Sequence, residues 1–496
     1  MRFPVGSAPS VHLLRWSLPT AGQPGRVWRI VSLTADPRPR PALSATPTML
    51  TPPYELLSVS WPRPVAEDNG RWTSEPEWDA PMSPLRPQPS WRIVGGEPAW
   101  TIDWCELFRG GIINLGSCEM RRFHVVFRIR ATASGRLVFW DDDGSIIRLG
   151  GQVIHDDRGS HPLWRAEVEV QAGDVLEVAQ WQATGAWLWG AQSTSLAPAD
   201  GEAVFAPHRD LAAERVAGGD GPPLKLYTGG QHPLRAIVGA YSLILNGYAP
   251  SAVHLYGGYQ WSPESDALFR AAFPFAEIVD TERVLSTARE LGGPRLADMA
   301  LRFWYVMKVC SAMLDGPETF CLMDDDVLVV DRVDDALEAF QSHDLVFIPD
   351  MDYGDCHHRT WSRVFGRSTV TPGGTFNAGL FWCRGVHDRR WMAERMRRVR
   401  GENCIGACWD QGFIATAYAD RPMHGLEANR HFYPVFEGMP GGILGYDWAA
   451  NPCGFRSVHW GGIPNKPDDA AMRYIGPQVL GHRAACAMEH DLALAG

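Results

Sequence analysis

"ETFCLMDDDVLVV", residues 318–330, is the stretch that decides the fold of the C-terminal half of this chain. Its apolar run has the length of a buried central strand and ends at Asp324, Asp325 and Asp326. Three adjacent carboxylates repel one another unless a cation lies between them. Because residues i and i+2 of an extended chain point the same way, Asp324 and Asp326 are expected to face one hard divalent cation.

Apolar strands alternate with helices around this stretch, which predicts an α/β domain with a mainly parallel sheet over 224–483. "LKLYTGG" and "AVHLYGG" are expected strands, and Pro233 opens a helix between them. A helix from about Glu264, the strand "AEIVD" and a long helix around 297–314 continue the series. Ligands of such sheets bind at the carboxyl ends of strands, so a purely structural acidic turn is the less favoured alternative.

The same motif leaves a second chemistry open. An Asp-x-Asp sequence also marks phosphatases of the haloacid-dehalogenase type, in which the first aspartate, here Asp324, is the nucleophile. In those enzymes the motif usually ends the first strand of the domain, whereas here it ends about the fourth.

Three further segments carry residues suited to metal, phosphate or sugar. "SVHWGGIPNKP" offers His459 for a metal and Lys466 for phosphate, and its glycines allow close backbone approach. "GGTFNAGLFWCR" contains Asn377, and "CWDQGFIATAY" contains Asp410 and Gln411 at an expected helix start. Each segment alone is also explained by a structural turn or a helix cap.

Together and in this order, the four segments resemble the glycosyltransferases of the GT-A fold, most closely the family that includes glycogenin and bacterial lipooligosaccharide galactosyltransferases. The resemblance covers 224–483 and implies a nucleotide-sugar-binding domain that moves a sugar from a donor, with UDP-sugar favoured, to a carbohydrate-containing acceptor. In that family the Asp-x-Asp and a late histidine bind manganese. The resemblance therefore implies Asp324, Asp326 and His459 as ligands of Mn²⁺ or Mg²⁺.

The resemblance also implies roles for residues around the metal. Asp410 and Gln411 would line the acceptor side, and the stereochemical outcome stays open, with Asp410 or Asp352 as the base of an inverting reaction. The catalytic residues are expected to be Asp410, Gln411 and Lys466. The donor-binding residues are expected to be Tyr227, Thr228, Asp324, Asp325, Asn377, Gly462 and Lys466.

The N-terminal part is organised differently. Of the 38 prolines, 17 precede residue 91, which predicts a largely irregular arm over 1–90. Six arginines and a single acid in the first 48 residues suit either a transit peptide or a true start at Met49. Short alternating segments such as "FHVVFRIRAT" then predict an all-β sandwich over 91–197.

Glycine, proline and charge predict a linker over 198–223, and 484–496 is expected to be a tail. The "WDDDGS" segment at Asp141 is expected to form a hairpin turn rather than a calcium site. Tryptophans of the sandwich, Trp181 among them, suit a core or a sugar-binding surface. An inactive lectin-like protein is therefore a further alternative to the enzyme.

Composition excludes some partners. A net charge of −11 lacks the basic footprint that nucleic acid requires. Ten scattered cysteines indicate reduced thiols of a cytoplasmic protein, and no apolar run reaches the length of a membrane span. The basic segment "DRRWMAERMRRVR" leaves peripheral membrane contact open, although a solvated helix face is the favoured interpretation.

Overall fold

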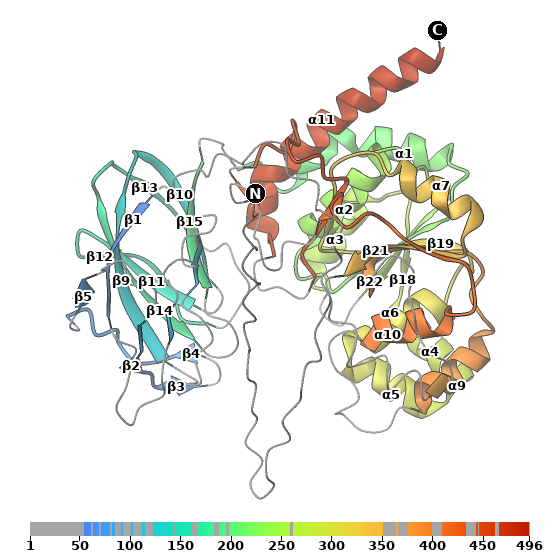
Figure 1. Cartoon of the computed structure of the whole chain (residues 1–496), viewed down its shortest axis with the longest axis horizontal. Helices are drawn as coiled ribbons and strands as arrows, with labels where there is room; N and C mark the ends of the chain where they lie inside the picture. The colour runs from blue at the N-terminus through green and yellow to red at the C-terminus, as the bar shows by residue number, and fades with distance from the viewer. Residues whose placement is uncertain are drawn as a thin grey trace, which may run out of the picture. The chain divides into compact units, whose positions relative to one another are not determined.

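The computed structural model has an N-terminal region of strands and a C-terminal α/β domain, whose elements are labelled in Figure 1. It describes residues 54–60, 63–68, 71–79, 82–84, 91–92, 101–102, 112–114, 123–141, 144–159, 166–182, 188–194, 198–257, 261–350, 364–365, 375–398, 409–432, 443–444, 446–461 and 466–495.

A seven-stranded sheet forms the centre of the C-terminal domain, in the order β18-β17-β16-β19-β22-β21-β23. The pairs from β18 to β19 are parallel, and so are β21 and β23, whereas β22 runs antiparallel to both of its neighbours. The largely parallel α/β sheet confirms the prediction. The strands are β16 (Leu224–Thr228), β17 (Val253–Gly257), β18 (Glu277–Val279), β19 (Phe320–Asp324), β21 (Leu345–Asp350), β22 (Thr375–Cys383) and β23 (Met423–Gly425).

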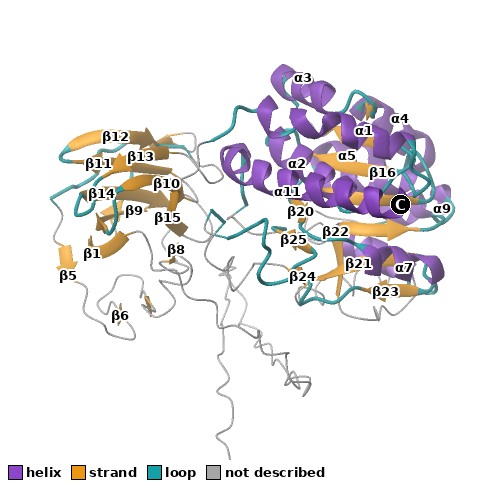
Figure 2. Ribbon diagram, turned by 90° about the horizontal axis from the view of Figure 1, so that it is seen from above, coloured by secondary structure: helices purple, strands orange, loops and turns teal. Residues whose placement is uncertain are grey.

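Two hydrophobic cores lie on opposite faces of this sheet. Along β19, Phe320 and Leu322 belong to one core, whereas Cys321 and Met323 belong to the other, as the alternation of side chains in a strand requires. Helices α2 (Pro233–Leu245) and α11 (Asp469–Ala495) lie side by side on the Cys321 face (Figure 2). The Phe320 face is covered by α4 (Thr281–Gly292), α5 (Pro294–Arg302), α6 (Trp304–Val309), α9 (Arg389–Arg397) and α10 (Trp409–Ala417).

Most predicted elements of the domain are present, with one clear exception. The helices opened by Pro233 and, in α3 (Pro263–Ala272), by Pro263 are confirmed. The single long helix expected over 297–314 is wrong, because the chain breaks at Phe303, whose backbone is extended (φ −130°, ψ 111°). Three shorter segments replace it, α5, α6 and a π-helical turn from Cys310 to Leu314, and neither proline nor glycine marks the break.

The two larger sheets in the described part of the N-terminal region are both antiparallel. Their orders are β12-β11-β14-β9-β1-β5 and β13-β10-β15-β8. The strands are β1 (Tyr54–Ser60), β5 (Met82–Pro84), β8 (Ile112–Asn114), β9 (Phe123–Ala131), β10 (Gly135–Asp141), β11 (Gly144–Leu149), β12 (Gln152–Asp157), β13 (Ala166–Val170), β14 (Val175–Gln182) and β15 (Leu188–Thr194).

Several boundaries differ from those expected. Strand β1 pairs with β9, so part of the arm expected to be irregular supplies a strand. The segment at Asp141 is not a hairpin turn, because β10 and β11 belong to different sheets. Helix α1 (Arg209–Ala217) lies within the expected linker, and α11 continues through most of the expected tail.

A buried lysine joins strand β16 to the π-helical turn. The Nζ atom of Lys225 donates hydrogen bonds to the carbonyl oxygens of Ala312 and Asp315, both at 2.6 Å, and lies 4.2 Å from the centre of the Phe320 ring. Burial lowers the pKa of Lys225 to about 7. The amine supplies hydrogen-bond donors to carbonyls at the end of the helical turn.

We predict that Lys225→Met destabilises the domain by about 3 kcal/mol, because buried carbonyl oxygens would lose their donor. Urea unfolding of both proteins would measure the change. Arg332→Met, which removes an exposed cation, is the control and should change the free energy of unfolding by less than about 0.5 kcal/mol. Equal stability of wild type and Lys225→Met would show that this lysine does not support the turn.

Candidate functional site

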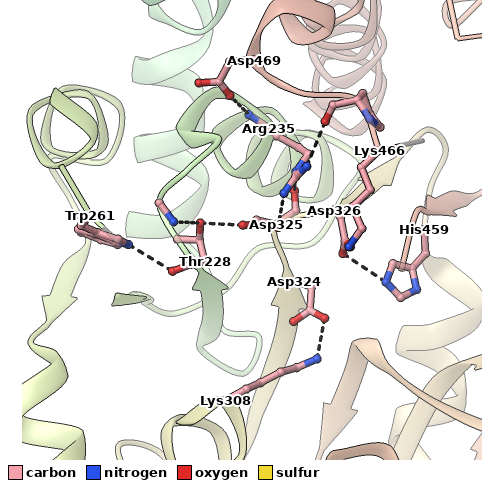
Figure 3. A network of polar contacts seen from close by, with 12 residues as sticks. Thr228, Arg235, Trp261, Lys308, Asp324, Asp325, Asp326, His459, Lys466 and Asp469 are labelled. Atoms are coloured by element: carbon pink, nitrogen blue, oxygen red, sulfur yellow. Dashed lines mark hydrogen bonds and ion pairs between the residues drawn. The ribbon is translucent and has the colours of Figure 1, made fainter. Parts of the chain in front are cut away.

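The three aspartates lie where β19 ends, at the carboxyl edge of the sheet. Strand β20 (Val327–Val329) follows them and pairs antiparallel with β25 (Ser457–His459), so that Val327 is opposite His459. This pairing brings the His459 Nε2 atom to 3.2 Å from an Asp326 carboxylate oxygen (Figure 3). One ligand atom from each of Asp324, Asp326 and His459 lies within 4.8 Å of the others.

This cluster fits a divalent cation. The Asp324 Oδ1 atom is buried and has no hydrogen-bond partner within the described part of the chain. Burial raises the pKa of Asp324. Burial also acts to raise the pKa of Asp326, but the nearby Lys466 and His459 outweigh it and hold this pKa well below the usual value. Two carboxylates and an imidazole are a donor set that Mn²⁺ accepts, and a cation would offset the repulsion between the two acids.

Two glycines make room for the His459 ring. A Cβ atom on Gly379 or on Gly461 would overlap the imidazole. The backbone N–H of Gly379 donates to the Asn377 side-chain oxygen at 2.7 Å, which orders the segment. Asn377 is fully buried, and its Nδ2 atom has no partner among the described residues. The Asn-Ala-Gly segment thus cradles the histidine, whereas the sequence indicated only a sugar contact.

Lys308 was missed by the sequence analysis. Its buried Nζ atom lies 2.6 Å from Asp324 and 3.1 Å from Asp410, so it joins the candidate metal site to α10. Asp410 and Gln411 lie in the first described turn of this helix, which the structure describes from Trp409. The rarity of lysine could have drawn attention to Lys308. Among 46 basic residues the only lysines are Lys225, Lys308 and Lys466.

Arg235 connects the acidic turn to the loop that carries Lys466. Its guanidinium donates to a carboxylate oxygen of Asp325 at 2.9 Å, to the Asp325 carbonyl at 3.1 Å and to the Pro467 carbonyl at 3.2 Å. The neighbouring Lys466 Nζ lies 2.5 Å from Asp326. One buried arginine of α2 therefore holds two segments of the site that are far apart in the sequence (Figure 3).

The remaining predicted donor-binding residues lie at the end of β16 or outside the described residues. The Thr228 hydroxyl donates to Asp325 at 2.9 Å, and the Tyr227 hydroxyl donates to the Trp304 carbonyl at 2.9 Å. Both carboxylate oxygens of Asp325 are thus engaged within the protein, by Thr228 and by Arg235. Gly462 falls outside the described residues, and so does Asp352, the other candidate base of an inverting reaction.

The basic segment forms helix α9 and is packed through its apolar side chains. Met392, Ala393 and Met396 are buried, which agrees with the favoured interpretation of a helix with one solvated face. Among the described residues, no helix has the length and apolar character needed to cross a membrane.

No family model and no curated protein sequence matches this chain. Similar solved structures include mouse xyloside xylosyltransferase 1 in its apo form, at 12% identity and a TM-score of 0.33, covering 50% of this chain and 99% of that one. The galactosyltransferase LgtC, in complex with donor and acceptor sugar analogues, matches at 13% identity and a TM-score of 0.31, covering 53% and 95%. The bifunctional glycosyltransferase WbbM matches at 10% identity and a TM-score of 0.32, covering 62% and 56%.

These three structures belong to the class that the sequence motifs resemble. Their identities and TM-scores are too low for any of their properties to be transferred to this chain. The function is therefore inferred from the geometry of the site itself.

We predict that Asp326→Asn weakens Mn²⁺ binding by more than about 100-fold, because the variant loses a charged ligand. Isothermal titration calorimetry with MnCl₂ measures this without any substrate. Asp334→Asn is the matched control, since Asp334 is an exposed acid of α7 (Asp334–Ser342) and its loss should leave the affinity unchanged. Equal Mn²⁺ affinity of wild type and Asp326→Asn would exclude this residue as a ligand.

The space that Gly379 and Gly461 leave for the His459 ring generates a separate prediction. Gly379→Ala should weaken Mn²⁺ binding about 10-fold to 100-fold, because the added methyl group displaces the His459 ring from its position. The same titration tests it, with the fold checked by circular dichroism. Gly481→Ala, where a Cβ atom meets open space, is the control. Unchanged affinity in Gly379→Ala would mean that the imidazole position does not matter for the metal.

Proposed function

We propose that the C-terminal domain is a metal-dependent glycosyltransferase that moves a sugar from a nucleotide-sugar donor, with UDP-sugar favoured, to a carbohydrate-containing acceptor. One observation carries the proposal: Asp324, Asp326 and His459 converge with Lys466 at the carboxyl end of β19. Crevices at the carboxyl ends of strands are the usual ligand sites of such sheets. Two acids, an imidazole and a lysine together suit a metal-bound diphosphate.

The reaction exchanges one glycosidic bond for another. The bond between the sugar C1 atom and the donor phosphate oxygen breaks, and the nucleoside diphosphate departs with the electron pair. A bond forms between C1 and the acceptor oxygen, whose proton passes to a base or to the departing phosphate. The transition state is oxocarbenium-like. A bound Mn²⁺ or Mg²⁺ supplies Lewis-acid stabilisation to the diphosphate.

Residues of the chain stabilise the same leaving group and orient the reacting sugar. Lys466 brings a positive charge to the metal cluster, where negative charge develops on the diphosphate. Lys308 holds Asp324 and Asp410 together, which places the Asp410 carboxylate beside the metal ligands. We assign Asp410 and Gln411 to the side of the site that meets the donor sugar and the acceptor. Asp410 is the candidate base if the reaction inverts the anomeric centre.

Neither alternative function is favoured by an observation. A phosphatase would need Asp324 as its nucleophile, yet Asp324 ends the fourth strand of its domain, and one of its oxygens forms an ion pair with Lys308. For a lectin-like protein, Trp181 offers no sugar surface because it is fully buried. We also infer that the two N-terminal sheets pack as the predicted sandwich, which the buried Leu137 and Ile147, one from each sheet, support.

We predict that Lys466→Met lowers kcat about 100-fold for Mn²⁺-dependent hydrolysis of the preferred UDP-sugar, because the departing diphosphate loses a fixed positive charge. Release of UDP from a panel of UDP-sugars measures the rate, with water replacing the acceptor. Arg430→Met, which removes a half-exposed cation whose ion-pair partner is Glu427, is the control.

The proposal fails if wild type releases UDP from no donor in the presence of Mn²⁺. Release of phosphate from p-nitrophenyl phosphate in the same preparations, lost in Asp324→Asn, would instead support the phosphatase. Equal rates in wild type and Lys466→Met would remove Lys466 from the catalytic residues.

A further inference from the structure

The break between α5 and α6 exposes an indole. Trp304 is 55% exposed and Leu301 is 54% exposed, and they are the only exposed large hydrophobic side chains among the described residues of the C-terminal domain. Phe303 and Tyr305, on either side of Trp304, are half-buried. A tryptophan at a solvent-exposed position leaves a large apolar surface in water.

The backbone of Trp304 is fixed at the carboxyl edge of the sheet. Its carbonyl oxygen accepts the hydrogen bond from the Tyr227 hydroxyl at 2.9 Å. Tyr227 belongs to β16 and lies opposite Asp324 in the pairing of β16 with β19. The exposed indole therefore starts from the same edge of the sheet as the metal cluster.

The direction of the Trp304 side chain follows from the helix. Trp304 and Lys308 are four residues apart in α6, so they share a face and are separated by about 6 Å along the axis. On that face Lys308 contacts both Asp324 and Asp410. Trp304 lies one turn closer to the start of the helix, on the same face as Lys308, and is exposed to solvent.

Further aromatic contacts link this turn to the predicted acceptor side. The Tyr305 ring lies 6.2 Å from the ring of Trp409 and 5.4 Å from that of Trp304. Trp409 precedes Asp410 and is fully buried, so these contacts connect the exposed indole to the packed interior of the domain. A platform of this kind is pre-organised, which lowers the entropic cost of binding a ligand.

We propose that Trp304 is the acceptor platform, on which a sugar ring of the carbohydrate acceptor stacks. The inference rests on the proposed function and names a subsite for its second substrate. The apolar face of a pyranose matches a flat exposed indole, whose N–H remains available to a hydroxyl group. The anionic diphosphate is drawn instead to the metal ligands and Lys466, so the neutral acceptor is the substrate that this surface suits.

The test uses the full chain with Mn²⁺ and UDP on a printed array of neutral oligosaccharides. We expect Trp304→Ala to weaken binding to the recognised glycans about tenfold, which corresponds to about 1.4 kcal/mol, and Trp304→Phe to retain most of it. Leu301→Ala is the matched control, because it removes an equally exposed apolar side chain that precedes the helix break, and it should bind as wild type does. Leu301→Ala should also hydrolyse the UDP-sugar with the kcat and KM of wild type.

Other outcomes overturn the assignment. Equal glycan binding by wild type and Trp304→Ala, or no glycan binding by wild type, excludes the acceptor platform even when UDP-sugar hydrolysis proceeds. A tenfold loss of UDP affinity in Trp304→Ala would move this residue to the nucleotide site. Binding to phosphatidylglycerol vesicles that is lost in both Trp304→Ala and Leu301→Ala would identify a lipid surface instead. Absence of UDP-sugar hydrolysis in wild type is a failure of the proposed function, and is distinct from all of these.

Discussion

Repulsion between three consecutive carboxylates at the end of a buried strand is the constraint on which the site depends. Each acid is matched by a cationic side chain from a different part of the chain. Lys308 of α6 pairs with Asp324, Arg235 of α2 pairs with Asp325, and Lys466 with His459 approaches Asp326. Because burial makes an unmatched charge costly, the aspartates require these partners for the domain to fold. The same requirement gathers the groups that the proposed metal-bound diphosphate would need.

The basic residue that pairs with each aspartate is an arginine in one case and a lysine in the other two, and this difference has a physical reason. Arg235 donates to three acceptors in two segments, which the planar guanidinium can do and an ammonium group cannot do as well. At Asp324 and Asp326 the cation is lysine, a compact charge on a flexible stem. In a chain with 46 basic residues and only three lysines, this use of lysine indicates a local requirement rather than general composition. We interpret Arg235 as the scaffold and Lys466 as the group that acts on substrate.

Residues without a side chain also shape the site. Gly379 and Gly461 come from β22 and from the residues after β25, and both leave space for the His459 imidazole. Strand β22 is the one that runs antiparallel within the largely parallel sheet, and this direction places its Asn-Ala-Gly segment beside the candidate metal ligands. The break at Phe303 acts similarly at the edge of the site, because it separates the packing face of α5 from that of α6 and leaves Trp304 in solvent.

The family resemblance implied the association of His459 and Lys466 with Asp324 and Asp326. By itself, the sequence determined the alternation of strands and helices and the position of Asp324 and Asp326 at a strand end. These features follow from local periodicity and from short motifs whose spacing is visible in one dimension. Only the tertiary structure revealed the partners of Lys308 and Arg235 and the approach of Gly379 to the His459 ring. These contacts join residues from 16 to 232 positions apart in the sequence. The tertiary structure also revealed strand β1 and the break at Phe303. Pairing across such separations depends on how the elements pack, and neither residue type nor spacing along the chain specifies it.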